Sequence, residues 1–153
     1  MTDMKQIAQQ VGWLASGFAN GIAFVPQEKR NWKPAATSRS AQDILAHTTY
    51  WNLFFTRLLR GEGSWDVAED AWTRSTKELK DSEQAKKLAE KSAKDLSIAI
   101  EKLSPQDLGK EVDLPWGKQT LQGVALSGLW HLTYHVGQLF YMQTMLGDTE
   151  DHL

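Results

Sequence analysis

Four segments of the sequence repeat apolar residues at steps of three and four, which is the spacing of one buried face on an α-helix. The first of them shows the pattern plainly, with Met4, Ile7, Val11, Leu14 and Phe18 on one stripe. Amphipathic helices bury their apolar stripes by packing against one another. No long segment of the sequence alternates apolar and polar residues convincingly, as the strands of a β-sheet core would. The sequence therefore predicts an all-α fold, a four-helix bundle.

Capping and helix-breaking residues mark the ends of these segments. Ser40 and Asp43 have the spacing of a capping box, Ser104-Pro105 stops the third helix, and Gly61 and Gly147 follow the second and fourth. These signals place the helices at about 4–22, 41–60, 82–103 and 121–146.

The connections between the expected helices are long for a bundle. Residues 23–39 and 62–78 exceed ordinary helix joints, and "SWDVAEDAW" within the second can form a short helix. In the third connection Val112, Leu114 and Trp116 alternate with polar residues, which predicts a small extended flap. Connections of this length weaken the assumption that successive helices simply alternate up and down.

Composition narrows the classes of function. The 153 residues, 41% of them hydrophobic, fit one domain spanning 1–153. A net charge of -2 gives no basic surplus for nucleic acid, and the absence of cysteine excludes disulfides, thiolate nucleophiles and cysteine-based zinc sites. The start "MTDMKQIAQQVGWLASG" lacks the features of a signal peptide, and no window has the length of a membrane span. We expect a cytoplasmic protein.

Three of the four histidines lie on expected buried faces. His131 and His135 are four residues apart and therefore share a helix face, the one that carries Leu139, while Gln138 extends the same stripe. His47 lies on the apolar side of the second helix. Unpartnered burial costs about 1 to 3 kcal/mol for each ring, a penalty that a shared cation would remove. The pattern favours one metal ion bound by all three, and the alternative is a buried hydrogen-bond network.

The fourth histidine and the residues beside the other three lead to narrower expectations. His152, in the acidic tail "GDTEDHL", is expected to be solvated. Leu132 follows His131 where a His-Glu-x-x-His metalloprotease has its glutamate, and no Glu-x-x-His pair of a di-iron centre occurs. A general base would have to come from elsewhere, and the candidates are Asp43, Asp66, Glu69 and Asp70.

Two stretches resemble the motifs of a known family. "LAHTTYWNLFFTRLLRG" resembles the first motif of the DinB / YfiT-like superfamily, and "HLTYHVGQL" resembles its second, His-x-x-x-His-x-Gly-Gln. The resemblance implies a four-helix bundle with up-down-down-up topology, one divalent metal bound by His47, His131 and His135, and a homodimer. The Gly137-Gln138 pair matches the family's Gly-Gln, where glycine would permit close packing and glutamine would support the site or the helix packing.

Three protein ligands leave a coordination position open, as in catalytic rather than structural metal sites. Without a carboxylate ligand the ion keeps its full charge, which favours an incoming anion and lowers the pKa of a bound water. Zinc, nickel and iron all suit three imidazoles. The substrate would be a small molecule.

The resemblance implies two enzymatic functions, a thiol-dependent S-transferase or isomerase and a metal-dependent hydrolase. A thiol enzyme needs cationic groups near the metal, for which Arg57, Arg60 and Arg74 are the candidates, and a hydrolase needs a carboxylate within one water of it. The alternatives are a non-catalytic, metal-dependent ligand-binding or stress-response protein and a structural helical dimer without metal.

Overall fold

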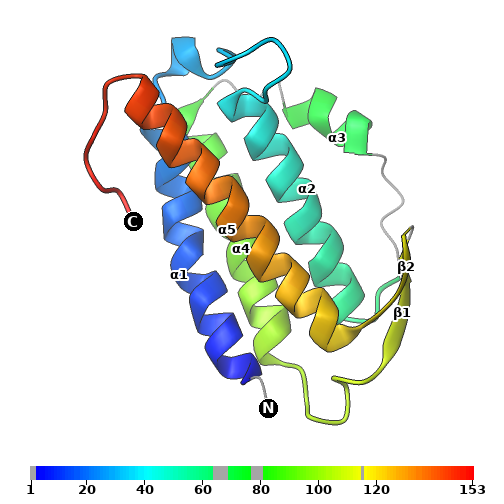
Figure 1. The fold of residues 1–153 in the computed structure, drawn as a ribbon. Helices are drawn as coiled ribbons and strands as arrows, with labels where there is room; N and C mark the ends of the chain where they lie inside the picture. Colours follow the sequence, from blue (N-terminus) through cyan, green and yellow to red (C-terminus); the bar gives the residue numbers. More distant parts are fainter. Residues whose placement is uncertain (1–2, 64–68, 77–80, 115) are drawn as a thin grey trace.

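Four long helices packed side by side make up most of the computed structural model, which describes residues 3–63, 69–76, 81–114 and 116–153 (Figure 1). They are α1 (Met4–Ala23), α2 (Ala41–Leu59), α4 (Ser82–Glu101) and α5 (Leu121–Met145). A side-chain oxygen caps the first turn of each helix, and the capping residues are Asp3, Ser40, Asp81 and Thr120. The four-helix bundle predicted from the sequence is confirmed.

The helices follow the up-down-down-up order. α1 and α5 run in one direction and α2 and α4 in the other (Figure 1). α1 packs mainly on α4 and α5, and α2 also packs on α4 and α5, so that α1 lies diagonally across from α2. The neighbours α2 and α4 are parallel, and the chain must therefore return along the length of α2, about 28 Å at 1.5 Å per residue, before α4 begins. This geometry accounts for the long second connection.

Short helices lie in both long connections before α4. The 3₁₀ helix η1 (Gln27–Lys29) follows α1, and α3 (Glu69–Thr76) packs beside α2. The Gln42 side chain on α2 donates a hydrogen bond to the carbonyl oxygen of Thr76 at 2.8 Å, which ties the end of α3 to the start of α2. The short helix predicted in "SWDVAEDAW" is found from Glu69 onward, while 64–68 lie outside the described residues.

A β-hairpin occupies the third connection. Strands β1 (Glu111–Leu114) and β2 (Gly117–Thr120) pair antiparallel, with Leu114 opposite Gly117. The extended flap predicted from Val112 and Leu114 is confirmed, but the sequence did not predict the second strand, because "GKQT" carries no apolar alternation. Trp116 follows β1 and places its ring 5.5 Å from that of Trp51 on α2, so the hairpin lies against the bundle.

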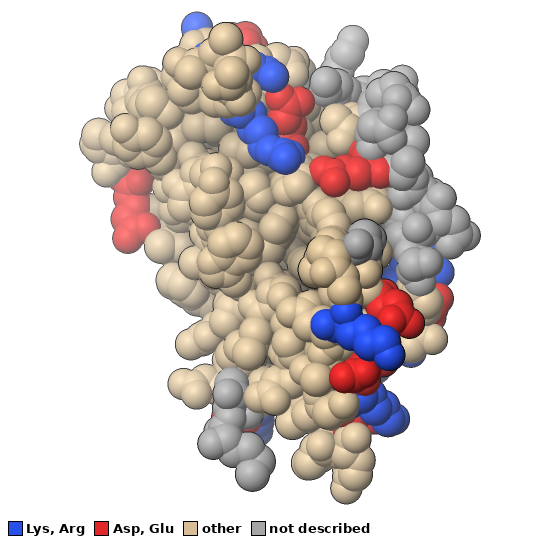
Figure 2. Space-filling view, turned by 45° about the vertical axis from the view of Figure 1, so that its right-hand side comes forward, with Lys and Arg blue, Asp and Glu red and all other residues tan. Residues whose placement is uncertain are grey.

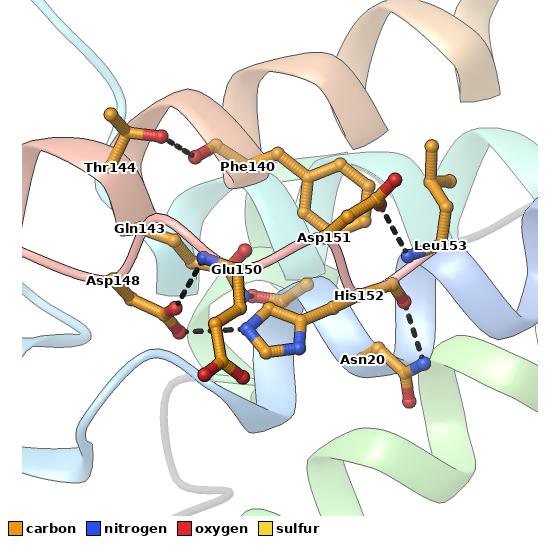
Figure 3. Close-up of polar contacts among 10 residues, drawn as sticks. Asn20, Phe140, Gln143, Thr144, Asp148, Glu150, Asp151, His152 and Leu153 are labelled. Atoms are coloured by element: carbon orange, nitrogen blue, oxygen red, sulfur yellow. Dashed lines mark hydrogen bonds and ion pairs between the residues drawn. The ribbon is translucent and has the colours of Figure 1, made fainter.

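The C-terminal tail folds back on α1 (Figure 3). The side chain of Asn20 donates to the carbonyl oxygen of His152 at 2.8 Å, and the His152 ring makes a 2.8 Å contact from Nε2 to Asp148. The ring also stacks on Phe24, with centroids 3.7 Å apart and planes 11° apart. The prediction that His152 is solvated is wrong, because its side chain is only 9% exposed.

The apolar faces of the four helices meet in one core. Its largest fully buried side chains include Phe18, Ile44, Leu96 and Leu132, one from each long helix. A Cβ added at Gly128 of α5 would lie 3.1 Å from the side chain of Leu96 on α4, so that side chain would have to shift to make room. None of the helices in the described part of the chain is long and apolar enough to span a membrane.

Candidate metal centre

The three histidines singled out from the sequence meet between α2 and α5. His47 comes from α2, and His131 and His135 come from successive turns of α5, which runs antiparallel beside it. One ligand atom from each ring lies within 4.8 Å of the other two. The Nε2 atoms of His47 and His131 are 3.0 Å apart, and the three ring centroids are separated by 4.5 to 5.0 Å. The fold thus brings together the three imidazole rings that the sequence pattern predicts to converge.

Two of the rings are oriented by acceptors on their outer nitrogens. Nδ1 of His47 contacts a carboxylate oxygen of Glu69 on α3, and Nδ1 of His135 lies 2.7 Å from the amide oxygen of Gln138. Each acceptor favours the tautomer with the proton on Nδ1, which leaves the Nε2 lone pair free toward the centre of the cluster. Nδ1 of His131 is buried and has no hydrogen-bond partner among the described residues.

Burial keeps these imidazoles neutral. Loss of solvent lowers the pKa of His131 to about 3, assisted by the charges of His135 and His47. Loss of solvent also lowers the pKa of His135 to about 4, although its bond to Gln138 acts in the opposite direction. The pKa of His47 is lowered by burial too, against the opposing effect of Glu69. Neutral imidazole is the form that binds metal ions.

The donor set fits a divalent cation. If both Nε2 atoms of His47 and His131 lacked a proton, their lone pairs would face each other across 3.0 Å and repel. A cation bonded to both nitrogens would remove this repulsion, and the His135 ring offers a third nitrogen within 4.8 Å of the other two. Ligands of this kind suit zinc, nickel and iron alike.

A pocket of about 610 Å³ opens beside the cluster. All three histidines line it, and its other lining residues include Arg39, Tyr134, Tyr141 and Met142. Among the described residues, neither aspartate nor glutamate is part of its lining. Figure 2 shows a face of the molecule on which uncharged surface predominates and charged side chains gather mainly in its upper part and at its lower right. A pocket of this size holds a small organic molecule.

A second pocket, of about 370 Å³, reaches the cluster from the hairpin side. His47 and His131 line it together with aromatic side chains, namely Trp51, Phe55, Trp116 and Trp130. Ring centroids of Trp51 and Phe55 both lie 6.1 Å from that of His131. The three histidines therefore lie between two pockets. The larger one is lined by the positively charged Arg39, and the smaller one is lined mainly by aromatic side chains.

The candidate general bases Glu69 and Asp43 have different partners in the structure. Glu69 contacts His47 and so orients that ring. The carboxylate of Asp43 accepts from the backbone of Ser40 and pairs with Lys33 at 3.3 Å. Asp66 and the side chain of Asp70 lie outside the described residues. Among the described residues, no carboxylate lines the larger pocket.

The expectation that Arg57 and Arg60 lie near the site is wrong, and the structure does not test it for Arg74. Arg57 donates to the carbonyl oxygen of Glu62, Arg60 is exposed at the far end of α2, and the side chain of Arg74 lies outside the described residues. Arg39, two residues before α2, lines the larger pocket instead. It lies in an irregular loop, where no periodic pattern relates it to the histidines.

Of the Gly137-Gln138 pair, only the glutamine touches the cluster. Gly137 is exposed, and a Cβ added to it would meet nothing within 4 Å, so it does not serve close packing. Gln138 contacts His135 and lines the larger pocket.

Comparison with known proteins agrees with this geometry. The model of the DinB superfamily matches residues 18–139. A DinB-like protein of Bacillus subtilis, YjoA, is 22% identical over 95% of this chain and 94% of its own, with a TM-score of 0.69. YfiT of Bacillus subtilis, described as "a probable metal-dependent hydrolase with an unusual four-helix bundle topology", is 11% identical over 94% of this chain and 87% of its own, with a TM-score of 0.79. At these identities the two structures establish a shared fold. Comparison with curated proteins found no match.

Proposed function

Because this chain belongs to the DinB superfamily, we propose that it is a metal-dependent enzyme whose single divalent ion is bound by His47, His131 and His135. The observation that carries the proposal is the convergence of three neutral imidazoles from two helices on one point beside a pocket. A structural metal site in a protein is normally closed by a fourth protein ligand. Three ligands beside a pocket of about 610 Å³ fit a site that admits substrate.

Each residue of the site has a distinct task under this proposal. The histidines bind through Nε2, and Glu69 and Gln138 hold the rings of His47 and His135 in the tautomer that this requires. Burial keeps protons from competing for the nitrogens. When bound, the ion is a Lewis acid that lowers the pKa of a water or thiol at the open position and polarises the substrate.

Hydrolysis is the reaction that these features support best. Three neutral imidazoles would leave the charge of a bound ion undiminished, and such an ion would supply activation of water near neutral pH without a carboxylate base. This matches the lack of a carboxylate in the described lining of the larger pocket. The description of YfiT as a probable metal-dependent hydrolase points the same way.

A thiol-dependent transferase or isomerase is the second candidate, and one observation favours it. A low-molecular-weight thiol carries carboxylates, and Arg39 supplies a cationic group in the pocket that the histidines line. The two candidates differ in one measurable respect, because only the transferase requires added thiol for turnover.

The metal site is tested by elemental analysis of the purified protein and of the variants His47→Ala, His131→Ala and His135→Ala. We expect about one ion per chain in the parent and a sharp loss in each variant, because two imidazoles hold a divalent ion poorly. The matched control is His152→Ala, which removes a histidine from the tail and should keep the ion. If all three of these histidine variants kept a full complement of metal ion, the assignment of the ligands would be refuted.

The reaction is tested on metal-loaded protein with panels of esters, amides and electrophiles, each with and without thiol. Turnover without thiol supports the hydrolase, and strictly thiol-dependent turnover supports the transferase. Tight binding of small molecules with no turnover under any condition would instead identify a metal-dependent binding protein.

A further inference from the structure

We propose that the larger pocket binds a small organic carboxylate, and that Arg39 is the residue that pairs with the carboxylate group. The inference deepens the proposed function and rests on it in one respect, since the reacting part of the molecule is taken to lie at the three histidines. The pairing itself depends only on residues of the chain.

Arg39 carries a charge that the described part of the protein does not neutralise. Two other cations of the same connection have acidic neighbours, because Lys33 pairs with Asp43 at 3.3 Å and the charge of Asp81 acts on Arg30. Arg39 makes no ion pair with a described carboxylate, and the described lining of its pocket contains no aspartate or glutamate. Arg39 is exposed, so its guanidinium is accessible to an anionic ligand that enters the pocket.

Arg39 also lies close to the place where the reaction is proposed. Its positive charge contributes to lowering the pKa of all three histidines. The residue and the histidines line the same cavity, so one small molecule can reach both. A bound divalent ion would add to the positive charge, because no carboxylate is among the proposed ligands.

The shape and charge of the guanidinium favour a carboxylate. Its planar array of N–H donors matches the two oxygens of a carboxylate, and one positive charge balances one negative charge, whereas a phosphate monoester carries nearly two. The remaining walls suit a carbon skeleton, because Ile44, Met142 and Met145 are apolar and Tyr134 and Tyr141 add aromatic surface. Together these features select an organic acid over an inorganic anion.

The test compares matched ligands that differ only in charge. The probes are the monohydroxamates of succinic, glutaric and adipic acid, each paired with its neutral N-methylamide. The hydroxamate provides a metal-binding group common to both members of a pair, and three chain lengths sample the distance to Arg39. Affinities are measured by titration calorimetry on zinc-loaded protein and by ligand-observed NMR on metal-free protein, for the parent, Arg39→Gln, Arg39→Lys and Arg60→Gln.

For the best chain length, the parent should bind the carboxylate about tenfold more tightly than the amide, which equals about 1.4 kcal/mol. The preference should fall below about twofold in Arg39→Gln and be intermediate in Arg39→Lys, which keeps the charge but loses the planar array of donors. Arg60→Gln, which removes an exposed arginine at the far end of α2, should retain the full preference.

Three outcomes would overturn the inference: equal affinity for both members of every pair in the parent, a preference that survives Arg39→Gln, or tighter binding of a phosphonate of matched length than of every carboxylate. The parent comparison needs no substitution, so it decides the matter even if a variant fails to fold. If the protein binds no zinc, the proposed function fails, and the charge preference of the metal-free protein still tests the role of Arg39.

Discussion

Acid should destabilise the protein even without metal, because the histidines of the cluster bind protons in the unfolded chain at pH values where they stay neutral in the folded protein. Unfolded histidines titrate near pH 6.5, whereas burial lowers the pKa of His131 to about 3 and of His135 to about 4. At pH 5.0 both are protonated in the unfolded chain and neutral in the fold. At about 1.4 kcal/mol per pH unit, each contributes a loss of about 2 kcal/mol between pH 7.5 and 5.0, or about 4 kcal/mol together.

The sign follows from which state binds more protons. A lowered folded-state pKa means that the unfolded state holds the extra protons, so stability is fully present above pH 6.5 and falls as the pH drops toward 4. The pKa of His47 is shifted in the same direction. Most carboxylates titrate below pH 5, so the interval from 7.5 to 5.0 reports chiefly on histidine. A loss of about 4 kcal/mol is a large share of a typical domain stability of about 5–15 kcal/mol.

The same shifts predict how bound metal behaves. Metal binding requires neutral histidine, and on that ground alone the acid sensitivity would belong only to the metal-bound protein. Burial gives it to the metal-free protein as well, because the folded imidazoles are already neutral. The extra stability from metal should therefore change less between pH 7.5 and 5.0 than it would with ordinary histidines, because the folded-state pKa values of His131 and His135 are about 3 and about 4.

The assay is urea unfolding at several pH values, with chelator and with zinc. The double variant His131→Gln/His135→Gln should lose most of the pH dependence, because both titrating rings are gone. A metal-free parent whose unfolding free energy is unchanged between pH 7.5 and 5.0, or a double variant that keeps the full decline, would refute this reasoning.

Three further expectations concern the ligand support, the core and the assembly. Glu69→Gln should weaken zinc affinity about tenfold by removing the charged acceptor behind His47, and an unchanged dissociation constant would contradict that role. Leu132→Ala, at a fully buried position, should cost about 2–5 kcal/mol in urea unfolding, whereas Leu126→Ala, 39% exposed, should cost under about 0.5; equal losses would contradict the burial argument. We propose a homodimer, because α5 exposes apolar surface such as Trp130, 68% exposed; light scattering at micromolar concentration should give twice the 17.3 kDa chain mass, and a monomer mass would exclude it.

The helices and their buried faces follow from the sequence because both are local properties. The 3.6-residue period places His131 and His135 on one face whatever surrounds them, and side-chain caps such as Ser40 start a helix through bonds within its first turn. The same locality explains the extended segment before Trp116. Each of these features depends on residues a few positions apart, so a linear pattern is enough to predict it.

The surroundings of the cluster depend on how distant segments pack. His47 reaches the α5 pair only because α2 lies antiparallel beside α5 and is rotated to face it. Glu69 and Arg39 come from long connections on either side of α2, where no periodicity fixes a direction, so sequence reasoning offered Glu69 only as a possible base and missed Arg39. The depth of burial that shifts the histidine pKa values is likewise a property of the whole bundle, because it is set by side chains from several helices that exclude water together.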